Sequence, residues 1–343
     1  MIRYIQEKKI DYSLFKEILS DSSATNQFTN NGPAKLELEK KIKHVLELPD
    51  TKAVVCTTNG TLALHALFFF FKERGLKKFV TPSYTFPSSI VGGFKTKVVD
   101  ISLDNYCFDE EDKVIEENDC IIITNLFGTY PKNLKNILQK CQENNTKVIL
   151  DNASSPMTEI DGENFCCLGD ASFGSLHHTK YLGFGEGGFI VIDKEHEEEI
   201  NRILGFGFTG KTVERISNRH SSNFKISDIA AAAIAQHITN YDLIEHKQKQ
   251  DLFVEMLTGV KGVTMFNYSE GVVYGSLPVV FENPIKAAFF RDNYIEAHKY
   301  YYPLDKHKNS LFLYDRIINL PLYSTLSNFE IEKMVKIVKL GIG

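Results

Sequence analysis

The 343-residue chain lacks several features that place a protein in a special class. The apolar stretch LALHALFFFF at 62–71 is far too short to cross a bilayer, and the opening MIRYIQEKKIDYSLF has no apolar signal segment. No basic cluster marks a nucleic-acid-binding face, and the net charge is a mild -5. These absences predict a cytoplasmic protein with no membrane and no nucleic-acid partner.

Cysteines at the spacing of a metal site are also missing. No C-x-x-C pair occurs among the six cysteines, which are Cys56, Cys107, Cys120, Cys141, Cys166 and Cys167. This excludes the usual zinc cage and a disulfide framework, so we expect reduced thiols, mostly in the core. The neighbours His177 and His178 do not make a metal site either, because adjacent side chains on a strand point to opposite faces and no third ligand is evident. We predict no metal.

What the sequence does contain is ordinary globular composition, with 43% hydrophobic and 24% charged residues, and a length that fits two domains. Short apolar runs alternate with helix candidates at 61–74 and 132–144, which is the pattern of a doubly wound α/β sheet. We interpret these runs as buried, mostly parallel strands. They are KAVVCT near 52, KKFVTP near 77, KVVDIS near 97, CIIITNLFG near 120, KVILD near 147 and GFIVID near 188.

The pattern changes at about residue 240. A helix-like segment at 238–257 is followed by alternation typical of an antiparallel sheet at 262–282, and a last helix is expected at 328–339. We therefore predict a large domain over 1–240, which includes the N-terminal segment, and a smaller C-terminal α+β domain over 241–343.

Three glycines, Gly183, Gly185 and Gly188, spell G-x-G-x-x-G, the motif of a dinucleotide site and hence of an NAD oxidoreductase. That motif needs a strand before it and a helix opening at its third glycine, because the helix N-terminus holds the pyrophosphate. Here the polar segment HHTKYL precedes the motif and the apolar run FIVID follows it. We interpret the glycines as a tight turn that leads into a strand.

A better anion site lies in VVCTTNGTLALHAL, at 54–67. A strand ends near Cys56 and Asn59-Gly60-Thr61 opens an apolar helix, whose free backbone N–H groups suit a phosphate. These residues fit a plain helix cap equally well. Lys180, at the mouth of the glycine turn, is also compatible with a solvated lysine. Asp151 ends a strand at the carboxyl edge, where open α/β sheets bind ligands, but it could also cap a turn.

Taken in order, these pieces resemble the DegT/StrS sugar aminotransferases, pyridoxal phosphate (PLP) enzymes with the fold type I architecture of aspartate aminotransferase. The resemblance covers most of the chain. It is carried by TTNGTLALHAL, TPSYTFPSS, VVDISLDNYCFDEED, NLFGTYPKNL, VILDNASS, SLHHTKYLGFGEGGFIVID, SNFKISDIAAAAIAQ, YYYPLDKH and INLPLYSTLS. It implies that 1–240 is a PLP-binding domain.

The resemblance implies roles for individual residues. Lys180 matches the lysine that forms a Schiff base with PLP and then moves a proton. Asp151 matches the carboxylate that keeps the pyridine nitrogen protonated. Phe86 matches an aromatic residue stacked on the ring.

For the phosphate, the resemblance implies backbone donors at Gly60 and Thr61 and a side-chain ligand at Ser175. Asn223 matches an asparagine that reaches the phosphate of the neighbouring subunit, which implies a homodimer with shared active sites.

The chain also departs from the family pattern. Ser154 stands where a longer Gln or His is usual, so its contact with the ring hydroxyl is open. Lys225 replaces an arginine and Asp305 a histidine, which puts substrate contacts from the small domain in doubt. We expect His177 to contact substrate. Lys180 argues against the family branch that has histidine there and catalyses dehydration.

We therefore predict transfer of an amino group from L-glutamate to a nucleotide-linked keto sugar, with PLP alternating with its pyridoxamine form. The expected acceptor is C4 of a dTDP-, UDP- or GDP-4-keto-6-deoxyhexose used for surface polysaccharide, such as the O-antigen of lipopolysaccharide or a capsule. Two alternatives stay open, namely amination at C3 and a regulatory relative that binds PLP without turnover.

Overall fold

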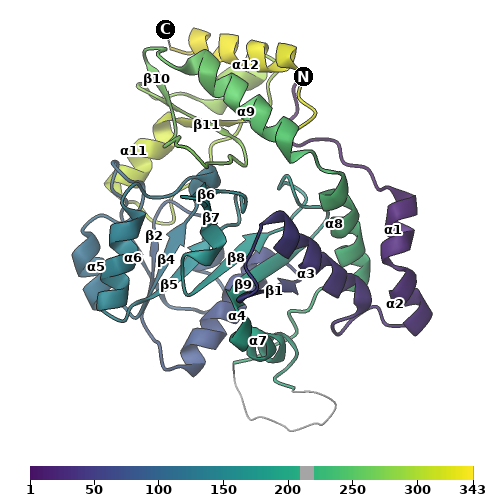
Figure 1. Cartoon of the computed structure of the whole chain (residues 1–343). Helices are drawn as coiled ribbons and strands as arrows, with labels where there is room; N and C mark the ends of the chain where they lie inside the picture. Colours follow the sequence, from purple (N-terminus) through teal and green to yellow (C-terminus); the bar gives the residue numbers. More distant parts are fainter. Residues whose placement is uncertain (209–219, 343) are drawn as a thin grey trace.

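The structure is a computed structural model, and it describes residues 1–208 and 220–342. A seven-stranded sheet forms its centre, and a smaller three-stranded sheet lies above it in Figure 1. The large sheet has the strand order β1-β9-β8-β5-β4-β2-β3. Its strands are β1 Lys52–Thr57, β2 Phe79–Pro82, β3 Thr96–Val99, β4 Cys120–Thr124, β5 Lys147–Asp151, β8 Ala171–Ser175 and β9 Gly188–Asp193.

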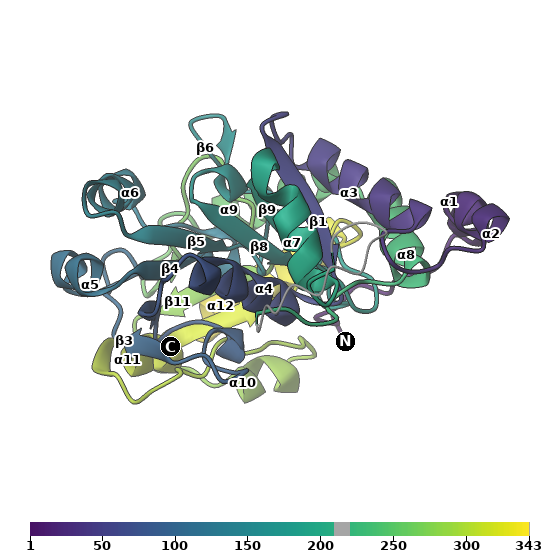
Figure 2. The same ribbon diagram turned by 90° about the horizontal axis from the view of Figure 1, so that it is seen from below.

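Apolar helices cover both faces of this sheet, as the predicted doubly wound α/β fold requires. Successive strand residues point to opposite faces, so Ile122 of β4 packs with α4 and α7, whereas Ile121 and Ile123 pack towards α5 and α6. The helices of the large part are α1 Tyr12–Ile18, α2 Ser20–Thr25, α3 Pro33–Val45, α4 Gly60–Glu73, α5 Glu111–Glu117, α6 Leu134–Glu143, α7 Glu197–Leu204 and α8 Asp228–Asn240. Figure 2 shows α1 and α2 at one end of the molecule, beside α8.

One predicted strand direction is wrong. β9, the run GFIVID, is antiparallel to both of its neighbours, β1 and β8. No helix separates β8 from β9, and parallel neighbours need a crossover of a dozen or more residues, usually helical. The chain therefore turns back directly through residues 176–187, which we call the lysine loop.

The smaller sheet is antiparallel, as the alternation predicted, and consists of β10 Val263–Met265, β11 Leu277–Phe281 and β12 Ile317–Leu320. It is covered by α9 Leu243–Leu257, α10 Ala287–Asp292, α11 Lys308–Arg316 and α12 Asn328–Leu340. A further two-stranded ribbon joins β6 Glu159–Ile160 to β7 Glu163–Asn164. Short 3-10 turns complete the chain at Pro87–Ser89, Leu126–Gly128, Phe165–Cys167 and Lys194–His196.

The single helix expected at 238–257 is also wrong, because the structure divides it. α8 ends at Asn240, and Tyr241 has extended backbone angles. Asp242 then caps α9 by accepting a hydrogen bond from the backbone N–H of Glu245 at 2.9 Å. An Asp followed three residues later by Glu is a helix-start signal, so this break was readable in the sequence.

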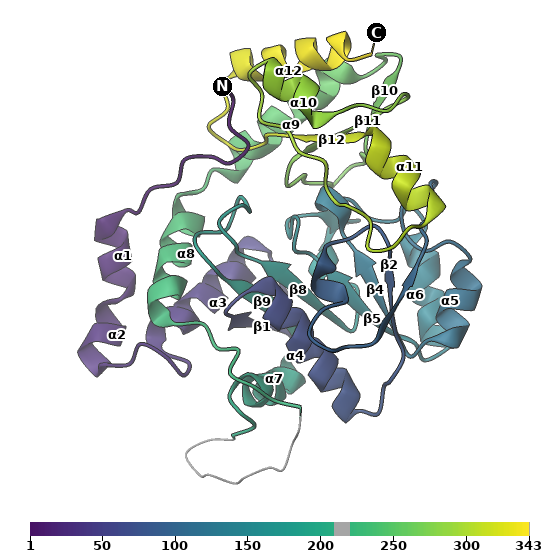
Figure 3. The same ribbon diagram turned by 180° about the vertical axis from the view of Figure 1, so that it is seen from behind.

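The N-terminal segment crosses to the small sheet. Ile2 pairs with Ile295, and its side chain is buried in the same core as α9 and α12. Figure 3 shows the N-terminus beside α12 and the first residues running down to α1. The division at residue 240 stays a prediction, and these contacts show that residues from both sides of it share one core.

The cysteines and the membrane expectation can be checked directly. All six cysteines are buried and free, as predicted. Over residues 1–208 and 220–342, no helix is long and apolar enough to span a membrane.

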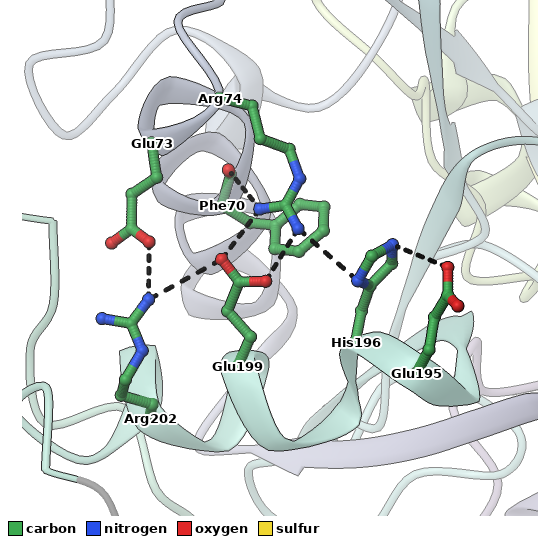
Figure 4. Close-up of polar contacts among 7 residues, drawn as sticks. All are labelled: Phe70, Glu73, Arg74, Glu195, His196, Glu199 and Arg202. Carbon is green, nitrogen blue, oxygen red and sulfur yellow. Dashed lines mark hydrogen bonds and ion pairs between the residues drawn. The ribbon is translucent and has the colours of Figure 1, made fainter.

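Helix α4 is held at its C-terminal end by charged contacts with α7, drawn in Figure 4. Arg74 makes two hydrogen bonds to the carboxylate of Glu199, at 2.8 and 2.7 Å, and its guanidinium lies over the ring of Phe70. Arg202 donates to Glu73 at 2.6 Å. Such bidentate pairs fix geometry as well as adding energy, so they orient the helix whose N-terminus reaches the sheet edge.

Two of the three G-x-G-x-x-G glycines, Gly183 and Gly188, serve close packing of the backbone. A Cβ on Gly188 would lie 2.3 Å from the carbonyl carbon of Asn59 and 2.5 Å from the nitrogen of Gly60. A Cβ on Gly183 would lie 2.1 Å from the carbonyl oxygen of His177. The tight-turn interpretation therefore has a physical basis, because β9 passes directly against the start of α4.

We predict that Gly188→Ala lowers the free energy of unfolding by about 1–3 kcal/mol, because the new methyl group meets backbone that cannot rotate away. Gly185→Ala is the matched comparison. Gly185 has φ 68°, and a methyl group there would have nothing within 4 Å, so only backbone conformation is tested, at about 1 kcal/mol. Urea denaturation measures both, and an equal loss in the two variants would contradict the close-packing explanation.

Candidate active site

A cavity of about 500 Å³ opens at the carboxyl edge of the large sheet. β4, β5 and β8 run parallel and end there at Thr124, Asp151 and Ser175, and α4 begins there after β1. Gly275 and Ser276, which directly precede β11, together with Tyr300, Tyr301 and the N-terminal Tyr4 complete its wall. Eight of the nine predicted site residues line it: Gly60, Thr61, Phe86, Asp151, Ser154, Ser175, His177 and Lys180.

One end of the cavity is suited to an anion. Asn59 caps α4 by accepting a hydrogen bond from the N–H of Leu62 at 2.9 Å, so the cap interpretation is correct. The N–H groups of Gly60 and Thr61 belong to the first turn, where no intrahelical acceptor exists. Ser175 lies against this turn, since a Cβ on Gly60 would be 3.1 Å from the Ser175 Cβ. The free helix start and the hydroxyl therefore face the same space.

The other end carries a buried carboxylate. Asp151 is 3% exposed and accepts hydrogen bonds from the N–H of Ala153 at 3.0 Å and from the Thr85 hydroxyl at 3.5 Å. Burial raises the pKa of Asp151 to about 6, although the Ala153 N–H, the Lys180 ammonium and Thr85 act in the opposite direction. Within the described part of the chain it has no ion-pair partner at salt-bridge distance, so it is suited to receive a cation from a ligand.

Lys180 enters the cavity from the lysine loop. Two turns flank it, with the N–H of Lys180 donating to the carbonyl of His177 at 2.8 Å and the N–H of Gly183 donating to the carbonyl of Lys180 at 2.9 Å. Burial lowers the pKa of the Lys180 ammonium, and the carboxylate of Asp151 partly opposes this. A lysine amine with a lowered pKa is available as a nucleophile and base at neutral pH.

Aromatic residues border the middle of the cavity. Phe86 is 51% exposed, which leaves one side of its ring open to a ligand. Tyr301 meets Phe86 edge-on at 5.8 Å between centroids and stacks on Phe127 at 5.8 Å. These rings form an apolar part of the cavity wall.

Ser154 is hydrogen-bonded to the hydroxyl of Tyr301, and burial together with the Asp151 charge raises the pKa of that tyrosine. Sequence reasoning missed Tyr301 and Tyr4 as cavity residues. The only signal for Tyr301 was the aromatic block YYYPLDKH, and nothing in the sequence marked Tyr4.

The structure corrects the placement of the histidines. His177 and His178 lie in the lysine loop, beyond the end of β8 at Ser175, so strand alternation does not apply to them. His177 Nδ1 is 2.9 Å from the Thr179 hydroxyl, and Nε2 is 3.5 Å from Glu186. The searched residues, 1–208 and 220–342, hold no group of three His, Cys, Asp or Glu side chains that could bind a metal ion.

Asn223 is exposed and does not line the cavity of its own chain. It forms an isolated bridge with Gly205. Lys225 is half-buried, and its ammonium lies 4.7 Å from the ring centroid of Phe206. Asp305 is exposed and is not a wall residue either.

The donor set matches PLP. The free helix start and Ser175 suit a phosphate, the buried carboxylate of Asp151 suits a protonated ring nitrogen, and Lys180 is an amine beside them. The roles of these residues remain predictions.

Comparison with known proteins now identifies the chain. Residues 10–339 match the model of the DegT/DnrJ/EryC1/StrS aminotransferase family, so the protein belongs to this family and is an aminotransferase. The predicted family and enzyme class are confirmed.

Three similar proteins illustrate the match. The dTDP-4-amino-4,6-dideoxy-D-glucose transaminase of Shigella dysenteriae is 26% identical, with 91% of each chain covered. The GDP-perosamine synthase of Escherichia coli O157:H7 is 24% identical, over 80% of this chain and 81% of that protein. The crystal structure of a provisionally assigned PLP-dependent aminotransferase from Bacillus cereus superposes with a TM-score of 0.85 at 22% identity, over 98% of this chain and 99% of that one. The predicted fold is confirmed.

We predict that Asp151→Asn stabilises the cofactor-free protein at neutral pH. The folded pKa of about 6 exceeds the unfolded value, so the Asp151 contribution is fully present below about pH 4 and is lost as the pH rises through about 6. The neutral amide avoids this loss, so the variant should gain about 3 kcal/mol over wild type at pH 7 and almost nothing at pH 4. Denaturant unfolding at several pH values measures this, and an equal difference at all pH values would contradict it.

Proposed function

We propose that this aminotransferase moves the amino group of L-glutamate to a nucleotide-linked keto sugar. The observation that carries the proposal is the cavity in which the Lys180 amine, the Asp151 carboxylate and the start of α4 converge. The relatives support the substrate class, because one is named for a dTDP-linked amino sugar and another for GDP-perosamine.

PLP is the cofactor, as the resemblance predicted. When bound, it supplies an aromatic ring that accepts electrons from the substrate carbon. In the proposed arrangement, the N–H groups of Gly60 and Thr61 and the hydroxyl of Ser175 hold its phosphate. The carboxylate of Asp151 keeps its ring nitrogen protonated, and Phe86 covers the ring.

Lys180 is the proposed base and acid. Its neutral amine would take the proton from the donor carbon and would return a proton during the reverse half-reaction. Burial of Lys180 serves this role, since it favours the neutral amine over the ammonium. Donor and acceptor use the same cavity in turn, so the kinetics should be ping-pong.

For the acceptor, we propose C4 of a 4-keto-6-deoxyhexose carried by dTDP, UDP or GDP, for surface polysaccharide. The name of the Shigella relative, a 4-amino-4,6-dideoxy sugar transaminase, favours C4 over C3. We propose His177 as a substrate contact, because its ring borders the cavity near the loop surface.

A homodimer with shared sites completes the proposal. Asn223 lies outside the cavity of its own chain, which is what a residue that serves the neighbouring subunit requires. We propose that it contacts the phosphate across the interface.

We predict that Lys180→Ala abolishes turnover of L-glutamate with a keto sugar. The wild-type protein should be yellow and should lose this absorption on adding glutamate, whereas the variant should show no glutamate response, because no amine remains to move the proton. The matched control is Lys132→Ala, an exposed lysine away from the cavity, which should behave as wild type. Retained turnover in the Lys180 variant would refute the mechanism.

Mass analysis of products from a panel of nucleotide keto sugars identifies the acceptor. A wild-type protein that is yellow but is never converted by glutamate would support the regulatory alternative.

We predict that two inactive variants complement each other. Asn223→Asp should repel the phosphate, and Lys180→Ala removes the amine, so neither homodimer should work well. A mixed dimer holds one intact site, and random pairing of equal amounts should restore about a quarter of wild-type activity. Recovery is measured after subunit exchange, and its absence despite verified mixed dimers would show that each site belongs to one chain.

A further inference from the structure

The N-terminal Lys8 reaches across to the lysine loop. Its ammonium nitrogen lies 2.8 Å from the carbonyl oxygen of His178 and 2.5 Å from the carbonyl oxygens of Lys180 and Gly183. An ammonium group has three donors, and all three are used on one short loop. The central carbonyl of this set belongs to Lys180 itself.

A second side chain acts on the same loop. His237 of α8 lies with Nε2 2.8 Å from the carbonyl oxygen of Tyr181, so four of the six carbonyls from 178 to 183 have partners on Lys8 or His237. The loop has no regular strand or helix bonding to hold it over residues 176–187. Its shape is held by these two side chains together with backbone bonds across the loop, such as that from the His178 N–H to the Gly185 carbonyl at 2.7 Å, and by the contact of the Ser155 and Tyr181 hydroxyls at 2.8 Å.

Lys8 forms hydrogen bonds with the loop and does not form an ion pair within the described residues. Within the described part of the chain no carboxylate lies at salt-bridge distance from it, and burial lowers the pKa of Lys8 to about 7. By contrast, its neighbour Lys9 is 83% exposed in its side chain and pairs with Glu7 at 3.6 Å. A partly buried cation with carbonyl partners only carries a desolvation cost, so a role at this position is expected.

The segment that carries Lys8 is fixed at its other end. Ile2 exchanges hydrogen bonds with Tyr294 and Glu296 at 2.9 Å, and the N–H of Tyr4 donates to the Glu296 carboxylate at 2.9 Å. Tyr4 lines the cavity. Residues 2–8 thus form a strap from the segment at 294–296, past the cavity, to the lysine loop.

We propose that Lys8 is a positioning residue that holds the lysine loop in the shape that directs Lys180 into the cavity. Lys8 binds the carbonyl of Lys180 and carbonyls on both sides of it in the sequence. These hydrogen bonds fix the orientation of the peptide units that carry the Lys180 side chain. A small displacement of a reacting group can lower the reaction rate strongly, so a fixed loop favours proton transfer by Lys180. This role rests on the proposed function of Lys180, but the loop geometry does not.

The hydrogen bonds also depend on protonation. A neutral amine keeps only two donors, so the loop should loosen as Lys8 loses its proton. The groups that face Lys8 are His178 of the loop and His237 of α8. Burial and the charge of Lys8 lower the pKa of both histidines, and the pKa of His237 falls to about 4. Of these three groups, Lys8 is the one whose pKa, at about 7, lies at neutral pH.

The test compares Lys8→Met, Lys8→Arg and the matched control Lys9→Met in the full-length, PLP-loaded protein. The first readout is hydrogen exchange of the amides of Lys180, Gly183 and Phe184, which donate within the loop. Lys8→Met should exchange these amides at least about tenfold faster, whereas Lys8→Arg should stay within about threefold of wild type and Lys9→Met should match it.

The second readout is glutamate conversion. Lys8→Met should lower kcat by about 10- to 100-fold with little change in KM for glutamate, because binding groups elsewhere in the cavity are untouched. If Lys8→Met does not fold, wild type alone tests the proposal, since its loop protection, corrected for intrinsic exchange, should fall between about pH 6 and pH 8.

Unchanged loop exchange in Lys8→Met, or a wild-type protection that is flat across this pH range, would overturn the positioning role. Failure of the proposed function looks different, because a protein that does not aminate sugars would still show the change in loop exchange.

Discussion

The buried carboxylate of Asp151 is the constraint on which the rest of the site depends. It is nearly inaccessible to water, and burial raises its pKa to about 6. Holding a charge there is unfavourable unless a cation lies beside it, and in the proposed arrangement the protonated ring nitrogen of PLP would be that cation. The Lys180 ammonium relieves part of this cost in the free protein, but its own pKa is lowered by burial. Burial therefore disfavours the charged form of both groups, and the proposed cofactor contacts would offset that cost.

The topology of the large sheet brings Asp151 and Lys180 to the same edge. Asp151 ends β5 and Ser175 ends β8, its parallel neighbour, so both reach the same edge. Because β9 returns antiparallel, the lysine loop stays at that edge instead of crossing to the far end of the sheet. Gly188 then lets β9 pass against the first turn of α4. The helix start, the carboxylate and the amine thus converge as a consequence of one chain reversal.

Local sequence signals predicted the groups that lie next to regular elements. Asp151 ends an apolar run, and Gly60 opens an apolar helix, so strand and helix patterns located both. Lys180 needed the family resemblance, since its loop has no regular pattern. Tyr301 and Lys8 could not be predicted, because each reaches the site from more than a hundred residues away and only tertiary packing brings it there. Asn223 cannot be assessed within one chain, because its proposed partner belongs to a second subunit.

Backbone dipoles of opposite sign act at the two sides of the site. The first turn of α4 presents free N–H groups, which favour the phosphate of the cofactor. The lysine loop presents carbonyl oxygens, which attract the ammonium of Lys8. Both arrangements need backbone that approaches closely and keeps its shape, and the glycines at 183 and 188 permit that approach where any Cβ would collide. A glycine pattern that suggests a nucleotide site therefore has another physical origin here, since Gly183 allows the lysine loop to turn tightly on itself and Gly188 allows β9 to pack directly against the start of α4.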